Sequence, residues 1–271
     1  MPFTLITGEF VPEAGRPDGD SIRFRPEQPD LVFKLRRRRV PPKINQNNGT
    51  VQLRFEGIDT LESRANSTYA IPATDSNLAL CGVPDGKGIA RGYILSNQIG
   101  PNGRPIAFVY AGEPDDADGS EIFLEPEQMR ASVNVAQLER GHAYPLFYDT
   151  LFADLRCALV DAVSGARDGG KGIWAEDATQ TGALWRGYDG IGDMPPIFPK
   201  LWRRLESYGR DPDISDPSSL DEFRDYVKFV HPERVLILPE ARSTGLDNLI
   251  RTTGDTIRLD YRPEDLVIMS D

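Results

Sequence analysis

The chain has 271 residues, of which 39% are hydrophobic and 27% are charged, and its formal net charge is −11. A chain of this length can bury one sizeable core, or one core and a smaller appended module, so we expect one or two domains. The acidic balance excludes a protein that coats nucleic acid through general positive charge, because such binding depends on basic residues that neutralise phosphates. A site that acts on phosphodiesters stays compatible with this balance if its positive charge is local.

The apolar segments of the chain are too short to cross a membrane. No run reaches the roughly 18 apolar residues that a spanning helix requires, and residues 1–10 lack the basic and then apolar pattern of a signal peptide. We therefore expect a soluble protein without a membrane partner, with the cytoplasm as the favoured compartment.

The two cysteines, Cys81 and Cys157, make no disulfide framework, and no CxxC or Cys/His cluster indicates zinc. We expect both to be reduced core residues.

Residues 3–60 are predicted to consist mostly of strands. The extended stretches are PFTLITGEFV (2–11), SIRFR (21–25), LVFKL (31–35) and TVQLRFEGI (50–58). The Asp18-Gly19 pair between the first two predicts a tight turn. The last stretch alternates two sets of side chains: Val51, Leu53 and Phe55 on one face, and Gln52, Arg54 and Glu56 on the other. This period of two predicts a half-buried strand with the polar set outside the core.

The run KLRRRR (34–39) is the dense basic patch of the sequence. Such a run is typical of a solvated edge strand, where charge discourages pairing with other chains. Contact with the phosphate backbone of a nucleic acid is the alternative. The sequence leaves both interpretations open.

Beyond residue 60 the segment 64–88 is polar and irregular, with one or two helical turns expected at 77–83. Residues 90–112 then predict a second hairpin with Asn102-Gly103 as its turn. This turn places Arg104 directly after the reversal of the chain.

Helices are predicted to follow the second hairpin. One covers 132–141, with a serine at its start and a glycine where it ends. A longer one begins near Asp149, carries an apolar stripe and ends at Gly169-Gly170. The stripe consists of Leu151, Leu155, Leu159 and Val163. Strands followed by packed helices favour an α+β domain built on a small barrel.

Five polar side chains have the chemistry that phosphodiester hydrolysis requires: Asp20, Arg54, Asp59, Glu62 and Arg104. Taken singly, each is typical of an ordinary turn or strand position. Together, two aspartates and a backbone carbonyl could hold a hard divalent cation, and a free glutamate could activate water. Two arginines could stabilise the charge that grows on the phosphoryl oxygens in the transition state.

With these residues the chain resembles the staphylococcal nuclease (thermonuclease) family. The matching segments are DGDS (18–21), RFEGIDTLE (54–62), GRPIAFVY (103–110), SVNVAQLERGHAY (132–144) and GKGIWAED (170–177). The resemblance covers most of residues 3–177, with insertions at 25–50 and 64–88. It implies a five-stranded OB-type β-barrel with three helices in an α+β fold.

The resemblance also implies a role for each matching residue. Asp20 and Asp59 look like the family's calcium-binding carboxylates, with the carbonyl of Thr60 as a third ligand. Glu62 resembles the water-activating glutamate, and Arg54 and Arg104 resemble the two phosphate-binding arginines. The chain is thus expected to be a calcium-dependent endonuclease of DNA or RNA, with magnesium or manganese as other candidate ions. The alternative is an OB-fold module that binds single-stranded nucleic acid or a protein partner without turnover.

Several residues near the motifs depart from the family's pattern or extend it. Leu61 stands where the family usually has proline, and Pro101-Asn102 stand where its type member has lysine and tyrosine. Phe147 and Tyr148 fall near the family's base-stacking tyrosines and are candidate substrate-binding residues, although aromatic residues near the start of a helix are more typical of a core. Strict alternation would put Arg54 and Asp59 on opposite faces. A bulge at Gly57, or a phosphate that lies beyond the end of the strand, would reconcile them.

Residues 178–271 lie outside the resemblance. We therefore expect a nuclease-like OB-fold domain at 1–177 and a mixed α/β extension at 178–271 packed on it. Within the extension, PPIFPKLWRRLESYGR (195–210) predicts a helix, whereas ERVLILPE (233–240) and DTIRLDY (255–261) predict strands. The sequence indicates neither a function for this extension nor an oligomeric state.

Overall fold

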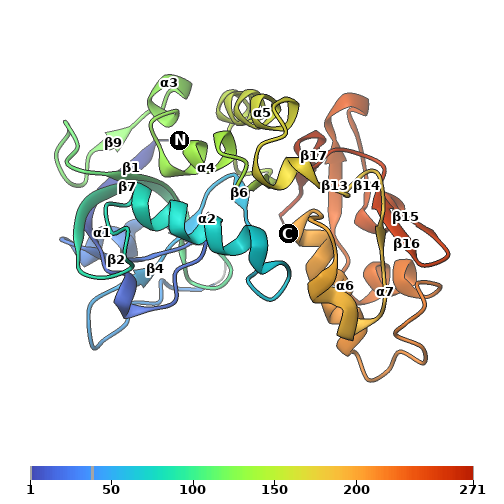
Figure 1. Ribbon diagram of the computed structural model, residues 1–271. Coiled ribbons are helices and arrows are strands. Elements are labelled where there is room, and N and C mark those ends of the chain that lie inside the picture. The colour runs from blue at the N-terminus through green and yellow to red at the C-terminus, as the bar shows by residue number, and fades with distance from the viewer. Residues whose placement is uncertain (1, 38–39, 271) are drawn as a thin grey trace.

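A computed structural model describes residues 2–37 and 40–270 of the chain. The fold is mixed α+β: a nearly closed, barrel-like sheet of six strands is accompanied by several helices (Figure 1). The strands of this sheet are β1 (Phe3–Phe10), β2 (Arg23–Pro26), β4 (Val51–Gln52), β5 (Arg54–Phe55), β7 (Ala90–Ile99) and β8 (Pro105–Ala111).

The order of strands explains why the sheet nearly closes. It runs β4-β2-β1-β7-β8-β5, so β4 and β5 are its two ends. Only Leu53 separates these two strands in the chain, and the two ends therefore lie next to each other. The arrangement is consistent with an OB-like barrel, whereas the count of five strands and the exact fold stay predictions.

The alternation of apolar residues in the strands produces the core of the barrel. Val51, Leu53 and Phe55 are fully buried, as their period of two predicts. The hairpin of β7 and β8 is also confirmed, and Gly103 in its turn has a φ of +77°, a conformation that favours glycine. The polar face was predicted wrongly at one position: Glu56, in the turn that follows β5, is buried.

Two segments differ from the predicted secondary structure. LVFKL, expected as a strand, lies mostly in helix α1 (Pro29–Lys34), where Pro29 presets the helical φ of the first turn. Segment 64–88 contains the 14-residue helix α2 (Ser67–Leu80) instead of one or two turns. The side-chain oxygen of Asn66 accepts a hydrogen bond from Thr68 N–H and so caps its N-terminus. The apolar side chains of α2 do not gather on one face, so periodicity could not reveal it.

The two helices predicted after the hairpin are present as α4 (Val133–Glu139) and α5 (Ala153–Asp168). Ser132 caps α4 by accepting a hydrogen bond from Val135 N–H. The apolar stripe that includes Leu155 and Leu159 is buried, as predicted. Cys81 is a buried free thiol, whereas Cys157 lies on the exposed side of α5, so its placement in the core was wrong.

The basic run 34–39 is described only in part. Arg36–Arg37 form β3, which pairs in parallel with β7 beside the main path of the sheet. This position fits an edge strand. Arg38 and Arg39 lie outside the described residues.

Residues 178–270, together with β11, form two smaller sheets and two helices, seen at the right of Figure 1. The helices are α6 (Pro199–Arg210) and α7 (Phe223–Val230). One sheet has the order β11-β17-β13-β14 and the other β12-β16-β15. Their strands are β11 (Phe147–Tyr148), β12 (Ala183–Leu184), β13 (Arg234–Ile237), β14 (Arg242–Gly245), β15 (Ile250–Thr253), β16 (Thr256–Leu259) and β17 (Leu266–Ile268). The helix and strands expected in this part are confirmed, whereas the domain division at residue 177 stays a prediction.

Short elements complete the description. They are β6 (Ile58–Asp59), β9 (Glu121–Ile122), β10 (Tyr144–Pro145), α3 (Pro126–Met129) and 3-10 turns at Pro12–Ala14, Gly172–Ala175, Tyr188–Asp193, Leu238–Glu240, Leu246–Asn248 and Pro263–Asp265. β6 pairs with β10 within residues 1–177, and the pairing of β11 with β17 connects this part of the chain to the C-terminal elements. Within residues 2–37 and 40–270, no helix has the length and apolar character needed to cross a membrane.

Candidate functional site

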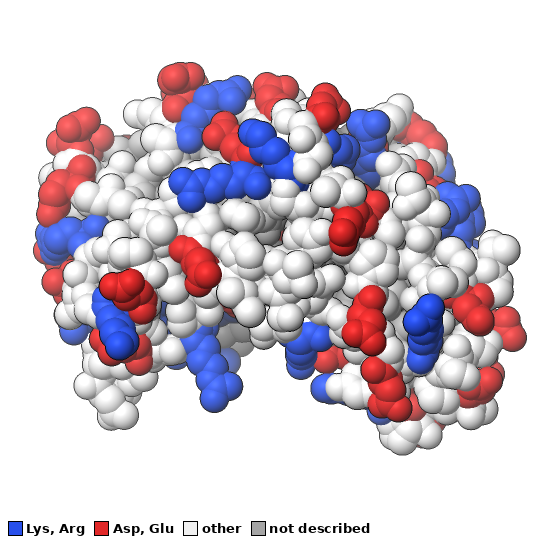
Figure 2. Space-filling view, in the orientation of Figure 1, with Lys and Arg blue, Asp and Glu red and all other residues white. Residues whose placement is uncertain are grey.

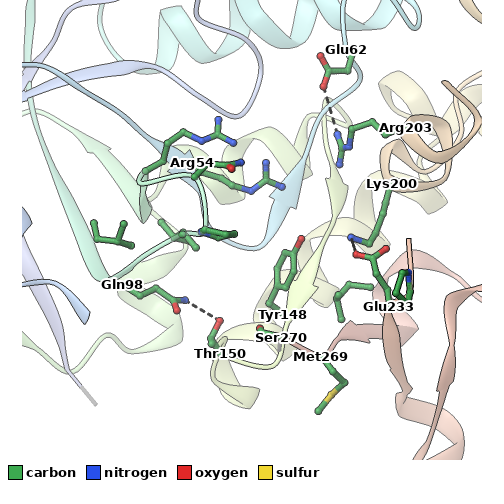
Figure 3. A pocket seen from close by; sticks show the side chains of 18 residues that line it. Arg54, Glu62, Gln98, Tyr148, Thr150, Lys200, Arg203, Glu233, Met269 and Ser270 are labelled. Carbon is green, nitrogen blue, oxygen red and sulfur yellow. Dashed lines mark hydrogen bonds and ion pairs between the residues drawn. The ribbon is translucent and has the colours of Figure 1, made fainter. Parts of the chain in front are cut away.

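A pocket of about 540 Å³ lies between the barrel and the C-terminal elements (Figure 3). Three residues predicted from the sequence to be catalytic line it together: Arg54, Glu62 and Arg104. The opposite wall comes from α6 and from the segment before β13. The pocket has the volume typical of a site for a small molecule or for one unit of a polymer.

A glycine turn brings Arg54 and Asp59 to the same side of the barrel. β5 ends at Phe55 and β6 begins at Ile58, and Gly57 between them has a φ of +76°. A Cβ atom at Gly57 would lie 2.5 Å from Leu159 Cδ1, so the position requires glycine for space as well as for conformation. As a result Arg54 Nη2 lies 3.6 Å from Asp59 Oδ1. The irregularity expected at Gly57 is thus present.

Asp59 is buried and carries an ion pair from the C-terminal half of the chain. Arg203 Nη1 donates to Asp59 Oδ1 at 3.2 Å, and Arg203 Nη2 donates to Asp59 Oδ2. Burial alone would raise the pKa of Asp59, but the guanidinium groups of Arg203 and Arg54 outweigh burial and hold this pKa below its usual range. Asp59 is therefore a carboxylate paired on both oxygens.

The Asp18–Ser21 turn places Asp20 near Asp59. The Asp20 carbonyl accepts a hydrogen bond from Phe55 N–H at 3.0 Å, which joins this turn to β5. Burial raises the pKa of Asp20 well above its usual range, and the negative charges of Asp18 and Asp59 raise it further. Thr60 also packs here, because a Cβ atom on Gly19 would lie 2.7 Å from Thr60 Cγ2. The three predicted metal ligands thus lie in one region of the molecule.

Glu62 and Arg104 reach the pocket from two different loops. Glu62 is 39% exposed, and its Oε1 lies 3.8 Å from Arg203 Nη1. A dashed line marks this ion pair in Figure 3. Leu61, at the position where the resemblance leads us to expect proline, is buried next to Glu62. Burial, and after it the nearby Arg54 charge, lowers the pKa of Arg104. The two arginines are therefore close enough to repel each other.

Only one of the two predicted substrate-binding aromatic residues faces the pocket. Phe147 has no exposed surface and belongs to the core, so its ring offers no stacking surface. Tyr148, its neighbour on β11, points the other way and lines the pocket. Lys200 Nζ lies 5.7 Å from the centre of the Tyr148 ring.

The residues that complete the pocket were not predicted from the sequence. Lys200, Arg203 and Glu233 all line it, and Figure 3 shows Lys200 against Glu233. Lys200 Nζ lies 2.6 Å from Glu233 Oε1, and Arg204 Nη2 lies 2.9 Å from Glu233 Oε2. The available signal was the spacing of Lys200 and Arg203, which puts two cations on one face of a helix. Nothing in the sequence around Lys200 and Arg203 indicates that this face of the helix contacts Glu233 and Asp59.

Glu56 is buried beside the pocket. Its burial raises its pKa to about 7, against the opposing effect of a hydrogen bond with the pocket residue Gln98. The Asn134 side chain holds the backbone around it by donating to the Glu56 carbonyl at 2.9 Å. Glu56 is therefore a further carboxyl group near the site, and its pKa of about 7 lies close to neutral pH.

A calcium ion bound by Asp20 and Asp59 would need free carboxylate oxygens, because hard cations bind several oxygen ligands. Both Asp59 oxygens are paired with Arg203, and Arg54 lies against one of them. In the part of the chain that the structure describes, no group of three His, Cys, Asp or Glu side chains is placed to hold a metal. These side chains as arranged do not fit the ion, and the dependence on calcium, magnesium or manganese stays a prediction from the resemblance.

A scan of the sequence against protein-family models and a search of curated proteins find no match. The resemblance to staphylococcal nuclease therefore depends on the motifs quoted above.

Proposed function

We propose that the chain is a nuclease that hydrolyses phosphodiester bonds of DNA or RNA in the pocket between the barrel and α6. The observation that supports this proposal most is that Arg54 and Glu62, from the motif at 54–62, converge on one pocket with Arg104, from the motif at 103–110. Two guanidinium groups can stabilise the charge that develops on a phosphoryl group, and one partly exposed carboxylate can act as general base toward water.

The distribution of charge agrees with this proposal. On the face shown in Figure 2, acidic and basic side chains are interspersed and no continuous basic track is present. The positive groups of the pocket are Arg54, Arg104, Lys200 and Arg203. A molecule with a net charge of −11 can thus attract a phosphate locally while it repels long, non-specific contact with nucleic acid.

In the proposed reaction, Arg54 and Arg104 bind the non-bridging oxygens of the phosphodiester and stabilise the charge that develops on them. Glu62 takes a proton from a water molecule, whose oxygen attacks phosphorus. A new P–O bond forms while the bond to the leaving sugar oxygen breaks, and that oxygen takes a proton from solvent. Tyr148 offers its ring to a neighbouring base or sugar.

The second candidate is a module that binds single-stranded nucleic acid or a protein partner without cleaving anything. The pairing of Arg203 with Asp59 favours this candidate, because it engages a carboxylate that the family uses for its metal. The two candidates share the phosphate-binding arginines and differ in whether Glu62 activates water.

Cleavage of labelled single-stranded DNA, duplex DNA and RNA by the full chain, with calcium and with chelator, distinguishes them. Glu62→Gln should lower the cleavage rate by roughly 10²–10⁴-fold, because a positioned general base contributes about that much. Glu113→Gln is the matched control, since Glu113 is exposed and pairs with Arg91 away from the pocket. Binding without cleavage in every condition would favour the second candidate, and equal rates for the two variants would refute the role of Glu62.

A further inference from the structure

Helix α6 is a fixed wall of the pocket. Leu201, Trp202 and Leu205 on this helix are each at most 2% exposed, so its inner side is packed into the core. Lys200 and Arg203 lie on the side that faces the pocket. A helix held by this much buried apolar surface keeps its charged side chains in place, unlike a flexible loop.

Arg203 occupies the position where the family resemblance predicts the positive charge of a metal ion. Its guanidinium group pairs with both oxygens of Asp59 and lies 3.8 Å from Glu62. A guanidinium group has five N–H donors, so further donors remain for a ligand in the pocket that Arg203 lines. The group is charged at every pH in which a protein stays folded.

We propose that Arg203 is a built-in cation that takes the place of the divalent ion and forms a third phosphate-binding arginine with Arg54 and Arg104. This inference rests on the proposed function, because it requires that the pocket binds a phosphodiester. It assigns to the C-terminal half of the chain a direct part in the site. It also implies that nucleic-acid binding by this pocket needs no metal.

The contacts of Asp59 favour Arg203 in place of a divalent ion over an ion that binds beside Arg203. A divalent ion on Asp59 would have to displace a two-bond pair to a guanidinium, which is among the strongest contacts that a carboxylate makes in proteins. Asp59 is only 1% exposed, so little water can reach its carboxylate. If an ion displaced Arg203, the ion would have to replace the hydrogen bonds that Arg203 now donates to Asp59. Arg54 also lies against Asp59, and its charge opposes a second cation.

Binding experiments test this inference without any measurement of cleavage. The probe is hexathymidylate, with its dissociation constant measured in chelator for the full chain and its variants. Arg203→Ala should weaken binding by about tenfold or more, since a charge-assisted pair to phosphate is lost. Arg210→Ala is the matched control, because Arg210 ends the same helix but is exposed and contacts Tyr188 and Glu206. This control should leave the affinity unchanged.

Two additions keep the test decisive if Arg203→Ala perturbs the fold by leaving Asp59 unpaired. The double variant Arg203→Ala with Asp59→Asn removes both charges, and it should bind the probe as weakly as the single variant. Calorimetric titration of the unmodified chain with calcium should show no binding event that Asp59→Asn abolishes. The inference is overturned by such a calcium-binding event, or by a folded Arg203→Ala variant with unchanged affinity. Absence of cleavage would instead count only against the proposed nuclease.

Discussion

Glu56 is a carboxyl group buried beside the pocket, and Gln98 is its hydrogen-bond partner. Its pKa is about 7 in the folded chain, compared with an ordinary value of 4.5. Between these two values the folded state binds more protons than the unfolded state, so the free energy of unfolding falls as pH rises. The stability that the protonated Glu56 side chain contributes is fully present below pH 4.5 and is lost as the pH rises through about 7.

We therefore expect Glu56→Gln to flatten the pH dependence of stability between pH 4.5 and 7. Above pH 7 the variant should exceed the unmodified chain by up to roughly 3 kcal/mol in the free energy of unfolding, because glutamine carries no charge to bury. Denaturant titrations at several pH values measure this difference. Glu113→Gln, a change at an exposed glutamate, should leave the slope as it is. Parallel curves for Glu56→Gln and the unmodified chain would contradict the cause assigned to Glu56.

Arg54 and Arg104 face the pocket as a pair, and lysine can match their charge but not their planar two-bond contact. Arg54→Lys or Arg104→Lys should lower the cleavage rate by about 10²–10³-fold, the usual effect of removing one donor to a developing oxyanion. Rates are measured on the substrate that the unmodified chain cleaves best. Arg91→Lys is the control, because Arg91 is exposed on β7 and pairs with Glu27 and Glu113. If the lysine variants kept the turnover of the unmodified chain, the proposal that Arg54 and Arg104 stabilise the transition state would be wrong.

At the scale of single elements, the Gly57 turn between β5 and β6 determines whether Arg54 and Asp59 meet. Gly57→Ala combines an unfavourable φ of +76° with a contact of 2.5 Å to Leu159 Cδ1. Gly112 has a φ of +88° but no atom within 4 Å of the added Cβ, so Gly112→Ala isolates the conformational cost. That cost is about 1–3 kcal/mol, and Gly57→Ala should exceed it and also reduce cleavage. Equal losses of thermal stability in the two variants would show that the turn is not crowded.

The sequence predicted those elements whose pattern is local. The buried alternation of Val51, Leu53 and Phe55, the hairpin with its turn at Gly103 and the stripe of α5 all follow from periodicity and glycine. The single strand predicted at 50–58 was wrong in extent, because this segment forms the three short strands β4, β5 and β6, each with a different partner. Helix α1 was predicted as a strand, because a short apolar run does not distinguish the two structures. Helix α2 lacks an apolar face, so no period indicated it.

The candidate site was predictable to the extent that its residues lie in motifs. Arg54, Glu62 and Arg104 do line one pocket, as the motifs suggested. Arg203 could not be found in this way, because its partner Asp59 is 144 residues away in the chain. The burial of Phe147 depends equally on the pairing of β11 with β17, which no local pattern shows.

At the scale of the whole molecule, the C-terminal elements complete both the core and the pocket. β17 pairs with β11, and its residues Leu266, Val267 and Ile268 are each at most 3% exposed. Tyr144 in the barrel half contacts Phe198 with 6.2 Å between ring centres. Arg203 from α6 neutralises Asp59. The two halves thus share buried apolar surface and a buried ion pair.

Truncation after Asp177 should therefore lower both solubility and thermal stability. Fully burying one large apolar side chain contributes about 1.5–3 kcal/mol, and the cut exposes several that the two halves bury together, Phe147 and Tyr144 among them. It also removes the Arg203 ion pair from Asp59, so that Arg54 at 3.6 Å is the partner left to offset a carboxylate in a site with little access to water. Thermal denaturation and light scattering of the fragment 1–177, beside the full chain in the same buffer, measure the two effects. In the fragment, which lacks Arg203, Asp59→Asn removes a buried charge and should recover part of the lost stability. In the full chain, the same change removes the partner of Arg203 and should lower the stability. A fragment as soluble and as stable as the full chain would show that residues 178–271 form an independent module.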